Sequence, residues 1–210
     1  MRPTPLLVAT ILASPLSANA SVILTDGDFG TATLGNYGTT TTSRLANGGD
    51  PDARIQVTTV SGTGTGGLII NAAAVTGPLE GASFNFGLSV LKGAGSFGEG
   101  QSIGLVIKQG STIWLQNLYV TGVRSNWTSQ TFSGTLLSTN FTRVSGSSTG
   151  GPILDGSVTT YFGFSASNSN SGTLTQYYDN WTLGIDTTAV PAPAAFGLLA
   201  MCGLAARRRA

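Results

Sequence analysis

The sequence contains no histidine and a single cysteine among its 210 residues. Histidine is the commonest general base and the commonest metal ligand of proteins, so its absence excludes every Ser-His-Asp or Cys-His catalytic arrangement. The cysteine, Cys202, lies in an apolar stretch near the C-terminus and has no second cysteine for a disulfide or a zinc site. These absences disfavour the common hydrolase and zinc-binding classes.

Charged residues are also scarce: they make up 9% of the chain, against about 25% in a typical soluble domain. The formal net charge is +1, but Arg2 and residues 207–209 carry four of the ten basic side chains at the two ends. The rest of the chain has six basic and nine acidic residues, a net charge near −3. Because nucleic-acid binding requires a basic footprint, we expect no nucleic-acid partner.

The first 20 residues have the order of a secretory signal peptide. Arg2 provides a positive n-region, residues 6–13 are an apolar run, and Ala18-Asn19-Ala20 is a cleavage site of the A-x-A type. We therefore predict a signal helix in residues 1–20 and cleavage by signal peptidase after Ala20, with Ala18 and Ala20 as the small residues of the site. A buried N-terminal strand or helix is the alternative.

Residues 187–210 have the pattern of a sorting segment. The uncharged stretch 194–206 is shorter than the ~20 residues that comfortably span a bilayer, and Arg207, Arg208 and Arg209 follow it. Positive residues remain on the cytoplasmic side, so a short hydrophobic helix here would leave the body facing outward. The alternative, a core helix of the folded domain, would leave the Arg triplet without a role.

This tail resembles the PEP-CTERM sorting signal of Gram-negative bacteria, which joins a Val-Pro-Glu-Pro type motif, a transmembrane helix and a basic cluster. The motif here is Val190-Pro191-Ala192-Pro193, with alanine in place of glutamate. The resemblance implies export, recognition by an exosortase-type enzyme, transient anchoring in the inner membrane and cleavage near Pro193, with release or transfer to the cell surface. Proteins with this signal are commonly linked to extracellular polysaccharide.

Residues 21–186 have the periodicity of one all-β domain. Phe84, Phe86 and Leu88 alternate with polar residues, which is the pattern of a half-buried strand. Glycine-rich turns separate such segments, and neither a helical stripe nor a βαβ spacing occurs, so we predict a sandwich or barrel, with a single jelly-roll-like β-sandwich favoured. The expected strands are residues 21–25, 53–60, 67–71, 83–91, 102–109, 112–120, 127–133, 139–144, 159–166 and 176–185.

The two ends of this body resemble the galactose-binding-like jelly rolls of many carbohydrate-binding modules. Those domains often open with a strand that leads into Asn/Asp-Gly-Asp-Phe, which is residues 26–29 here, and close with an aromatic strand, which is residues 177–183 here. The resemblance implies that the first and last strands are neighbours, and that a structural calcium ion is bound.

Calcium requires six to eight oxygen ligands, and Asp26, Asp28 and Asp179 would supply carboxylates if the two strands are neighbours. The alternative is turn chemistry, because Asp26-Gly27 and Asp50-Pro51 are common turn dipeptides. We expect no other cofactor.

The only glutamates, Glu80 and Glu99, lie between glycine-rich turns. A glycosidase needs two carboxylates at a set distance across a cleft, and solvated loop residues are the simpler interpretation, so we predict no enzymatic activity.

Aromatic side chains could stack on sugar rings, but most are expected in the core, with one or two exposed. Adjacent Tyr177 and Tyr178 must point to opposite faces of a strand. The candidates are Trp114, Trp127, Trp181, Tyr119, Tyr161, Tyr177 and Tyr178.

Three functions are compatible with these patterns. The first is an exported, surface-associated sandwich that contributes to the extracellular matrix by binding glycan. The second is a purely structural or adhesive surface protein without a small ligand. The third, a secreted polysaccharide hydrolase, is disfavoured by the missing histidine and the scarce carboxylates.

Overall fold

The computed structural model describes residues 20–50, 52–60, 65–94, 101–121, 125–168 and 172–187. Residues 1–19 and 188–210 lie outside the described residues. They include the predicted signal helix, Ala18, the motif 190–193, the hydrophobic helix 194–206 and the basic cluster 207–209. Within the described ranges, no helix has the length and apolar character needed to cross a membrane.

The described residues form β-strands and one short 3₁₀ helix. The strands of the first half are β1 (Ala20–Asp26), β2 (Thr33–Tyr37), β3 (Thr40–Leu45), β4 (Arg54–Val60), β5 (Thr65–Val75) and β6 (Ser83–Lys92). Those of the second half are β7 (Gln101–Gln109), β8 (Thr112–Thr121), β9 (Thr128–Thr135), β10 (Thr142–Ser145), β11 (Thr160–Asn168) and β12 (Thr173–Thr187), and the 3₁₀ helix η1 is Ser138–Asn140.

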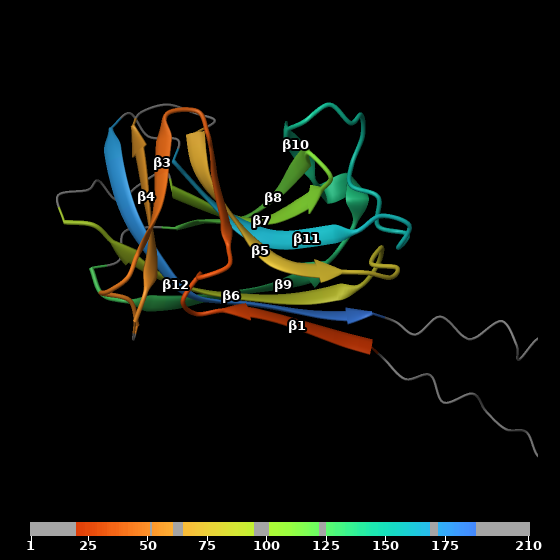
Figure 1. Cartoon of the computed structure of the whole chain (residues 1–210), viewed down its shortest axis with the longest axis horizontal. Helices are drawn as coiled ribbons and strands as arrows, with labels where there is room; N and C mark the ends of the chain where they lie inside the picture. Colours follow the sequence, from red (N-terminus) through yellow and green to blue (C-terminus); the bar gives the residue numbers. More distant parts are fainter. Residues whose placement is uncertain are drawn as a thin grey trace, which may run out of the picture. The chain divides into compact units, whose positions relative to one another are not determined.

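The strands form two six-stranded sheets (Figure 1). Sheet A has the order β3-β4-β12-β6-β9, with β1 paired to β12, and sheet B has the order β10-β8-β7-β11-β5-β2. Strands that are neighbours in a sheet are mostly distant in sequence, which is typical of a jelly roll rather than a meander. The predicted all-β sandwich is confirmed.

The core lies between the inner faces of the two sheets. Residues 84, 86, 88 and 90 of β6 are all buried, as their alternation predicts, and they face the buried Ile103, Leu105 and Ile107 of β7. The ring of Phe164 on β11 lies near those of Phe29, Tyr178 and Trp181, with centroid distances of 6.1, 5.6 and 6.5 Å. Because Phe29 follows β1 and the other two belong to β12, this aromatic group joins both ends of the body to sheet B.

The first and last strands are neighbours, as the resemblance implied, because β1 pairs with β12. The pairing of β12 with β6 shifts its register between Asp179 and Thr182. Asn180, inside this irregularity, has a φ of 51°, in the left-handed region. A Cβ on Gly27 would lie 4.0 Å from the side-chain oxygen of Asn180, so the end of β1 lies against the bulge of β12.

Two strands and several boundaries differ from the sequence prediction, since β5 and β12 extend beyond the predicted 67–71 and 176–185. β2 and β3 were not predicted, because residues 33–45 are mostly Thr, Gly, Asn and Ser and their half-exposed strands show no apolar alternation. The strand expected at 139–144 is wrong in its first half, which forms η1, and only Thr142–Ser145 is strand. The main-chain N–H of Ser138 donates to the carboxylate of Glu80 at 3.1 Å, which anchors this turn outside the sheet.

Candidate functional site

Asp26 and Asp28 occupy the turn that follows β1. The Asp26 carboxylate accepts hydrogen bonds from the main-chain N–H of Phe29 at 2.7 Å and from the side-chain amide of Asn71 at 3.4 Å. Burial raises the pKa of Asp26, and the neighbouring charge of Asp28 raises it further. Asp28 accepts the main-chain N–H of Gly30 at 2.8 Å. Both carboxylates therefore bind main-chain groups of their own turn.

Asp179 holds a different loop, the connection between β3 and β4. Its carboxylate accepts the main-chain N–H groups of Asp50 and, at 2.7 Å, of Asn180. The side-chain amide of Asn180 donates to the carbonyl of Asp50 at 2.5 Å. Burial raises the pKa of Asp179, and the charges of Asp50 and Asp52 raise it further. A Cβ on Gly49 would lie 2.5 Å from the Asp179 carboxylate, so only glycine lets the loop approach this closely.

The three expected calcium ligands therefore lie in two groups. Asp26 has Asp28 as its acidic neighbour, whereas Asp179 has Asp50 and Asp52. Within the described ranges, no three or more His, Cys, Asp or Glu residues are grouped so that they could hold a metal ion. As placed, the carboxylates do not form a single donor set, and their main-chain hydrogen bonds favour the turn-chemistry alternative over a calcium site.

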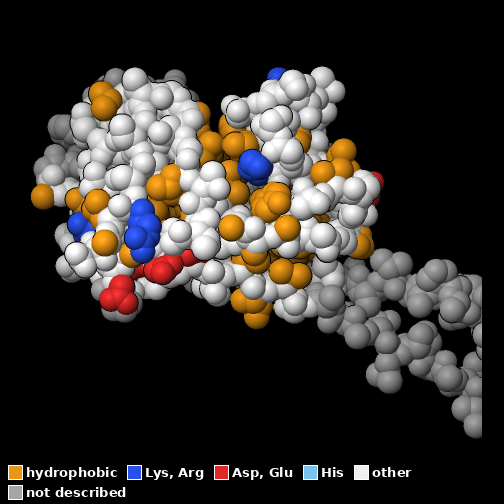
Figure 2. All heavy atoms as spheres, in the orientation of Figure 1, with side chains coloured by type: hydrophobic (Ala, Val, Ile, Leu, Met, Phe, Trp, Pro, Cys, Tyr) orange, Lys and Arg blue, Asp and Glu red, His pale blue; other side chains and the backbone are white. Residues whose placement is uncertain are grey.

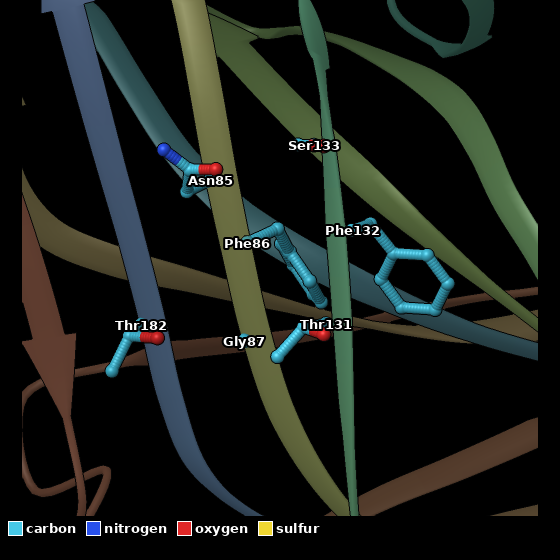
Figure 3. A pocket seen from close by; sticks show the side chains of 7 residues that line it. All are labelled: Asn85, Phe86, Gly87, Thr131, Phe132, Ser133 and Thr182. Atoms are coloured by element: carbon cyan, nitrogen blue, oxygen red, sulfur yellow. The ribbon is translucent and has the colours of Figure 1, made fainter.

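The outer face of sheet A carries a shallow pocket of about 300 Å³ (Figure 3). Its polar lining comes from three strands that lie side by side in sheet A, and its floor lies at Gly87. Of the two aromatic residues in its lining, Phe86 is buried and Phe132 is partly buried against the core. The lining residues are Asn85, Phe86, Gly87, Thr131, Phe132, Ser133 and Thr182.

The outer face of sheet B is different, because it carries a hydrophobic cluster of its own. Alternate side chains of a strand point to opposite faces, so the inward Ile107 of β7 places Val106 and Lys108 on the outside. Leu68, Ile70, Val106 and Leu115 form the centre of this cluster. Partly buried side chains form its rim, which we call the outer cluster rim: Tyr37, Ile113, Val144 and Tyr161.

Small residues allow these side chains to lie flat on the sheet. A Cβ on Gly66 would lie 2.5 Å from the hydroxyl of Tyr37, which therefore lies directly over Gly66. A Cβ on Gly104 would lie 2.8 Å from the Ser165 hydroxyl and would overlap Leu115. Glycine at these two positions of β5 and β7 therefore leaves room for the side chains of Tyr37 and Leu115.

Two half-buried tyrosines lie at the edges of this surface. The hydroxyl of Tyr37 bonds to Ser167, and burial raises the pKa of Tyr37. The ring of Tyr161 lies under the ammonium group of Lys108, which is 5.2 Å from the ring centroid. Figure 2 shows that the molecule is hollowed between the part that carries β3 and β4 and the part that carries β10, with hydrophobic side chains in the hollow.

Comparison with known proteins supports the fold. No protein-family model and no curated protein matches the sequence. The CBM22-1 xylan-binding domain of Paenibacillus barcinonensis Xyn10C matches with a TM-score of 0.53 and 12% identity, over 82% of this chain and 99% of that domain. The body resembles the sandwich of carbohydrate-binding modules. The CBM22-1-CBM22-2 tandem of the same protein matches with a TM-score of 0.54 and 12% identity, over 86% of this chain and 49% of the tandem.

A further match is the family 11 carbohydrate-binding module of Clostridium thermocellum in complex with a β-1,3-1,4-mixed-linked tetrasaccharide. Its TM-score is 0.47 and its identity 14%, over 80% of this chain and 96% of that module.

Three of the seven aromatic residues singled out in the sequence lie in the core. Trp114, Trp181 and Tyr178 are buried. Tyr177 points to the opposite face from Tyr178, as predicted, and its ring lies 3.8 Å from the guanidinium carbon of Arg54. Trp127 and Tyr161 are half-buried, and the side chain of Tyr119 lies outside the description.

Tyr37 was not among the sequence candidates, because nothing in the polar stretch around it indicates a strand. Glu80 is an exposed loop residue that bonds to Ser138, as expected. Glu99 lies outside the described residues.

Proposed function

We propose that the body binds a polysaccharide chain on the outer face of sheet B. One observation carries the proposal: Tyr37 and Tyr161 lie half-buried on a hydrophobic cluster that faces away from the other sheet. Sugar rings have apolar C–H faces, and tyrosine combines an apolar ring with a polar tip that suits a wet binding surface. The resemblance to carbohydrate-binding modules in fold supports this use of the surface.

The distance between the tyrosines favours an extended ligand over a single sugar. Tyr161 is six residues from Ser167 on β11, which corresponds to about 20 Å along the strand. Because the Tyr37 hydroxyl bonds to Ser167, the two rings lie at opposite ends of the outer face. A ligand that contacts both must span several sugar units.

Affinity electrophoresis of the purified chain in gels that contain soluble polysaccharides tests the proposal. We expect retardation by at least one polysaccharide, and at least a tenfold weaker affinity for Tyr161→Ala and for Tyr37→Ala. Tyr177→Ala is the matched control, since Tyr177 is also a half-buried strand tyrosine under a basic side chain, but belongs to sheet A. Equal affinity of all variants would contradict the proposed face.

We further propose that the protein is exported and sorted by its two ends. Two sequence patterns support this proposal. Residues 1–20 have the order of segments of a signal peptide, and residues 187–210 join the motif, the apolar stretch and the Arg triplet. Signal peptidase would cleave after Ala20, and an exosortase-type enzyme would cleave near Pro193, after transient anchoring in the inner membrane. The mature protein would then lie at the cell surface or in the extracellular matrix.

Mass spectrometry of the protein recovered from the producing bacterium tests the sorting proposal. The expected mature chain begins at Ser21 and lacks the Arg cluster, and deletion of Arg207–Arg209 is expected to retain unprocessed protein in the cell. An intact chain in the cytosol would contradict it.

A structural or adhesive role without a small ligand is the alternative function. It predicts no saturable binding to any glycan and no effect of the Tyr161 and Tyr37 variants. We expect no catalysis, which an assay for released reducing sugar on the same polysaccharides would check.

A further inference from the structure

The six strands of sheet B contain two charged residues, Lys108 and Arg143, and no acidic one. Arg143 is paired with Trp114 of β8, whose side chain belongs to the core between the sheets, so the side chain of Arg143 lies on the inner side of β10. Its guanidinium donates to the carbonyl of Ser148. Lys108 is therefore the one charge that the described strands of sheet B place on the outer face.

Lys108 has no acidic partner in the described part of the chain. Its ammonium group lies over the ring of Tyr161, at 5.2 Å from the centroid, and its cross-strand neighbours are Tyr161 on β11 and Ile113 on β8. The described acidic residues belong to sheet A or to loops: Asp26, Asp28, Asp50, Asp52, Glu80, Asp155, Asp179 and Asp186.

Apolar surroundings increase the effect of this charge. Its cross-strand neighbours Ile113 and Tyr161 are partly buried side chains of the outer cluster rim, so the ammonium group lies beside apolar surface. An ion pair in such a place is less screened than one in open solvent. A sugar ring stacked on Tyr161 would bring its substituents within reach of the ammonium group.

We infer that the polysaccharide bound at this face is acidic, with uronic acid units whose carboxylate pairs with Lys108 beside the Tyr161 ring. This inference rests on the proposed function, because it names the ligand class of the same face. It follows from charge complementarity: among the described strands of sheet B, Lys108 is the one charge on the outer face, and these strands contain no acidic residue.

The test compares each uronate polysaccharide with its carboxyl-reduced form, in which the same linkages carry a neutral hexose. The probes are alginate, polygalacturonate and glucuronoxylan, and the measurement is affinity electrophoresis of the full chain. We expect at least one of the three to bind about tenfold more tightly in its native form, with an affinity that falls as salt is added. Carboxyl reduction should remove most of the salt dependence.

Variants of Lys108 assign the effect to this side chain. Lys108→Gln, which keeps most of the aliphatic stem, is expected to bind the native polymer no better than the reduced one, and Lys108→Arg to keep the preference. Lys92→Gln on sheet A is the matched control, and thermal unfolding checks that each variant is folded. If Lys108→Gln were unfolded, Lys108→Arg and Lys108→Met would replace it. The inference would then be supported if Lys108→Arg keeps the preference for the native polymer and Lys108→Met loses it.

The outcomes separate the two proposals. If the wild type bound native and reduced polymers with equal affinity, and Tyr161→Ala bound neither, the proposal of an acidic ligand would be overturned. The proposed glycan-binding face would stand. A preference for the native polymer that persists in Lys108→Gln would also overturn the inference. No binding to these or to neutral polysaccharides would overturn both.

Discussion

Gly163 lies where β11 passes between β5 and β7, and the change of this glycine to alanine tests how tightly sheet B is built. The register of β11 against β5 shifts between Tyr161 and Gly163. A Cβ on Gly163 would lie 2.8 Å from the carbonyl carbon of Ile69 and 2.8 Å from the Cα of Ile70, and closer still to the Ile69 oxygen. These are main-chain atoms of a paired strand, so no rotamer change can relieve the overlap.

The expected cost lies at the upper end of what overpacking usually causes. Added methyl groups in a packed interior typically cost about 1–3 kcal/mol, and an overlap with main chain on a central pair of strands justifies about 3 kcal/mol. For a domain of this size about 1 kcal/mol changes the melting temperature by roughly 2–4 °C. We therefore expect Gly163→Ala to lower it by about 10 °C.

The same substitution at Gly184 on β12 is the control. A Cβ there would meet only the carbonyl oxygen of Asn85, at 3.9 Å, which is an ordinary contact. Because glycine within a strand is about 0.5–1 kcal/mol less favourable than alanine, Gly184→Ala should raise the melting temperature slightly. Thermal unfolding followed by circular dichroism measures both. If Gly163→Ala were as stable as the wild type, the close approach of β5 and β11 would be wrong.

Three further outcomes follow from hydrogen bonds of buried side chains. Asp179→Ala should lower the free energy of unfolding by about 2 kcal/mol, because two main-chain N–H groups lose their acceptor, whereas Asp186→Ala on the same strand should change it little in urea titrations. Trp114→Phe should cost about 1–3 kcal/mol, since the indole N–H donates to the carbonyl of Gly150 at 2.9 Å; an unchanged urea midpoint would contradict this. Since Asp26 and its neighbours bind main-chain groups in the turn, we expect calcium and a chelator to leave the melting temperature unchanged, and a calcium-dependent rise would show that the carboxylates converge on a cation.

Much of the fold could be predicted because strands with one face in the core carry their own pattern. β6 shows this best: Phe84, Phe86 and Leu88 alternate with polar residues, and the alternation requires an extended chain with one buried face. β2 and β3 were missed because half-exposed strands at the edge of each sheet need no such pattern. Their residues are held by pairing with β5 and β4, which the local sequence does not encode.

The candidate site was harder to predict than the fold. Tyr161 was among the aromatic candidates, but its neighbours come from β7 and β5, and Tyr37 comes from a strand that was not expected. Alternation along β7 places Val106 and Lys108 on the face opposite Ile107, yet nothing in the sequence says what that face meets. In contrast, the turn chemistry of Asp26 was readable, since its main-chain partner is only three residues away.

The sequence alone determined that the body is all-β, with a sandwich favoured over a barrel, because period-two alternation acts within a few neighbouring residues. It also determined that histidine is absent, that Cys202 has no second cysteine, and that the ends have the pattern of export and sorting signals. Only the tertiary structure decided which aromatic rings stay accessible and which carboxylates meet. Register between strands far apart in sequence places Tyr161 beside Lys108 and Asp179 against Asp50, and that register is a property of the folded sheets rather than of any one segment.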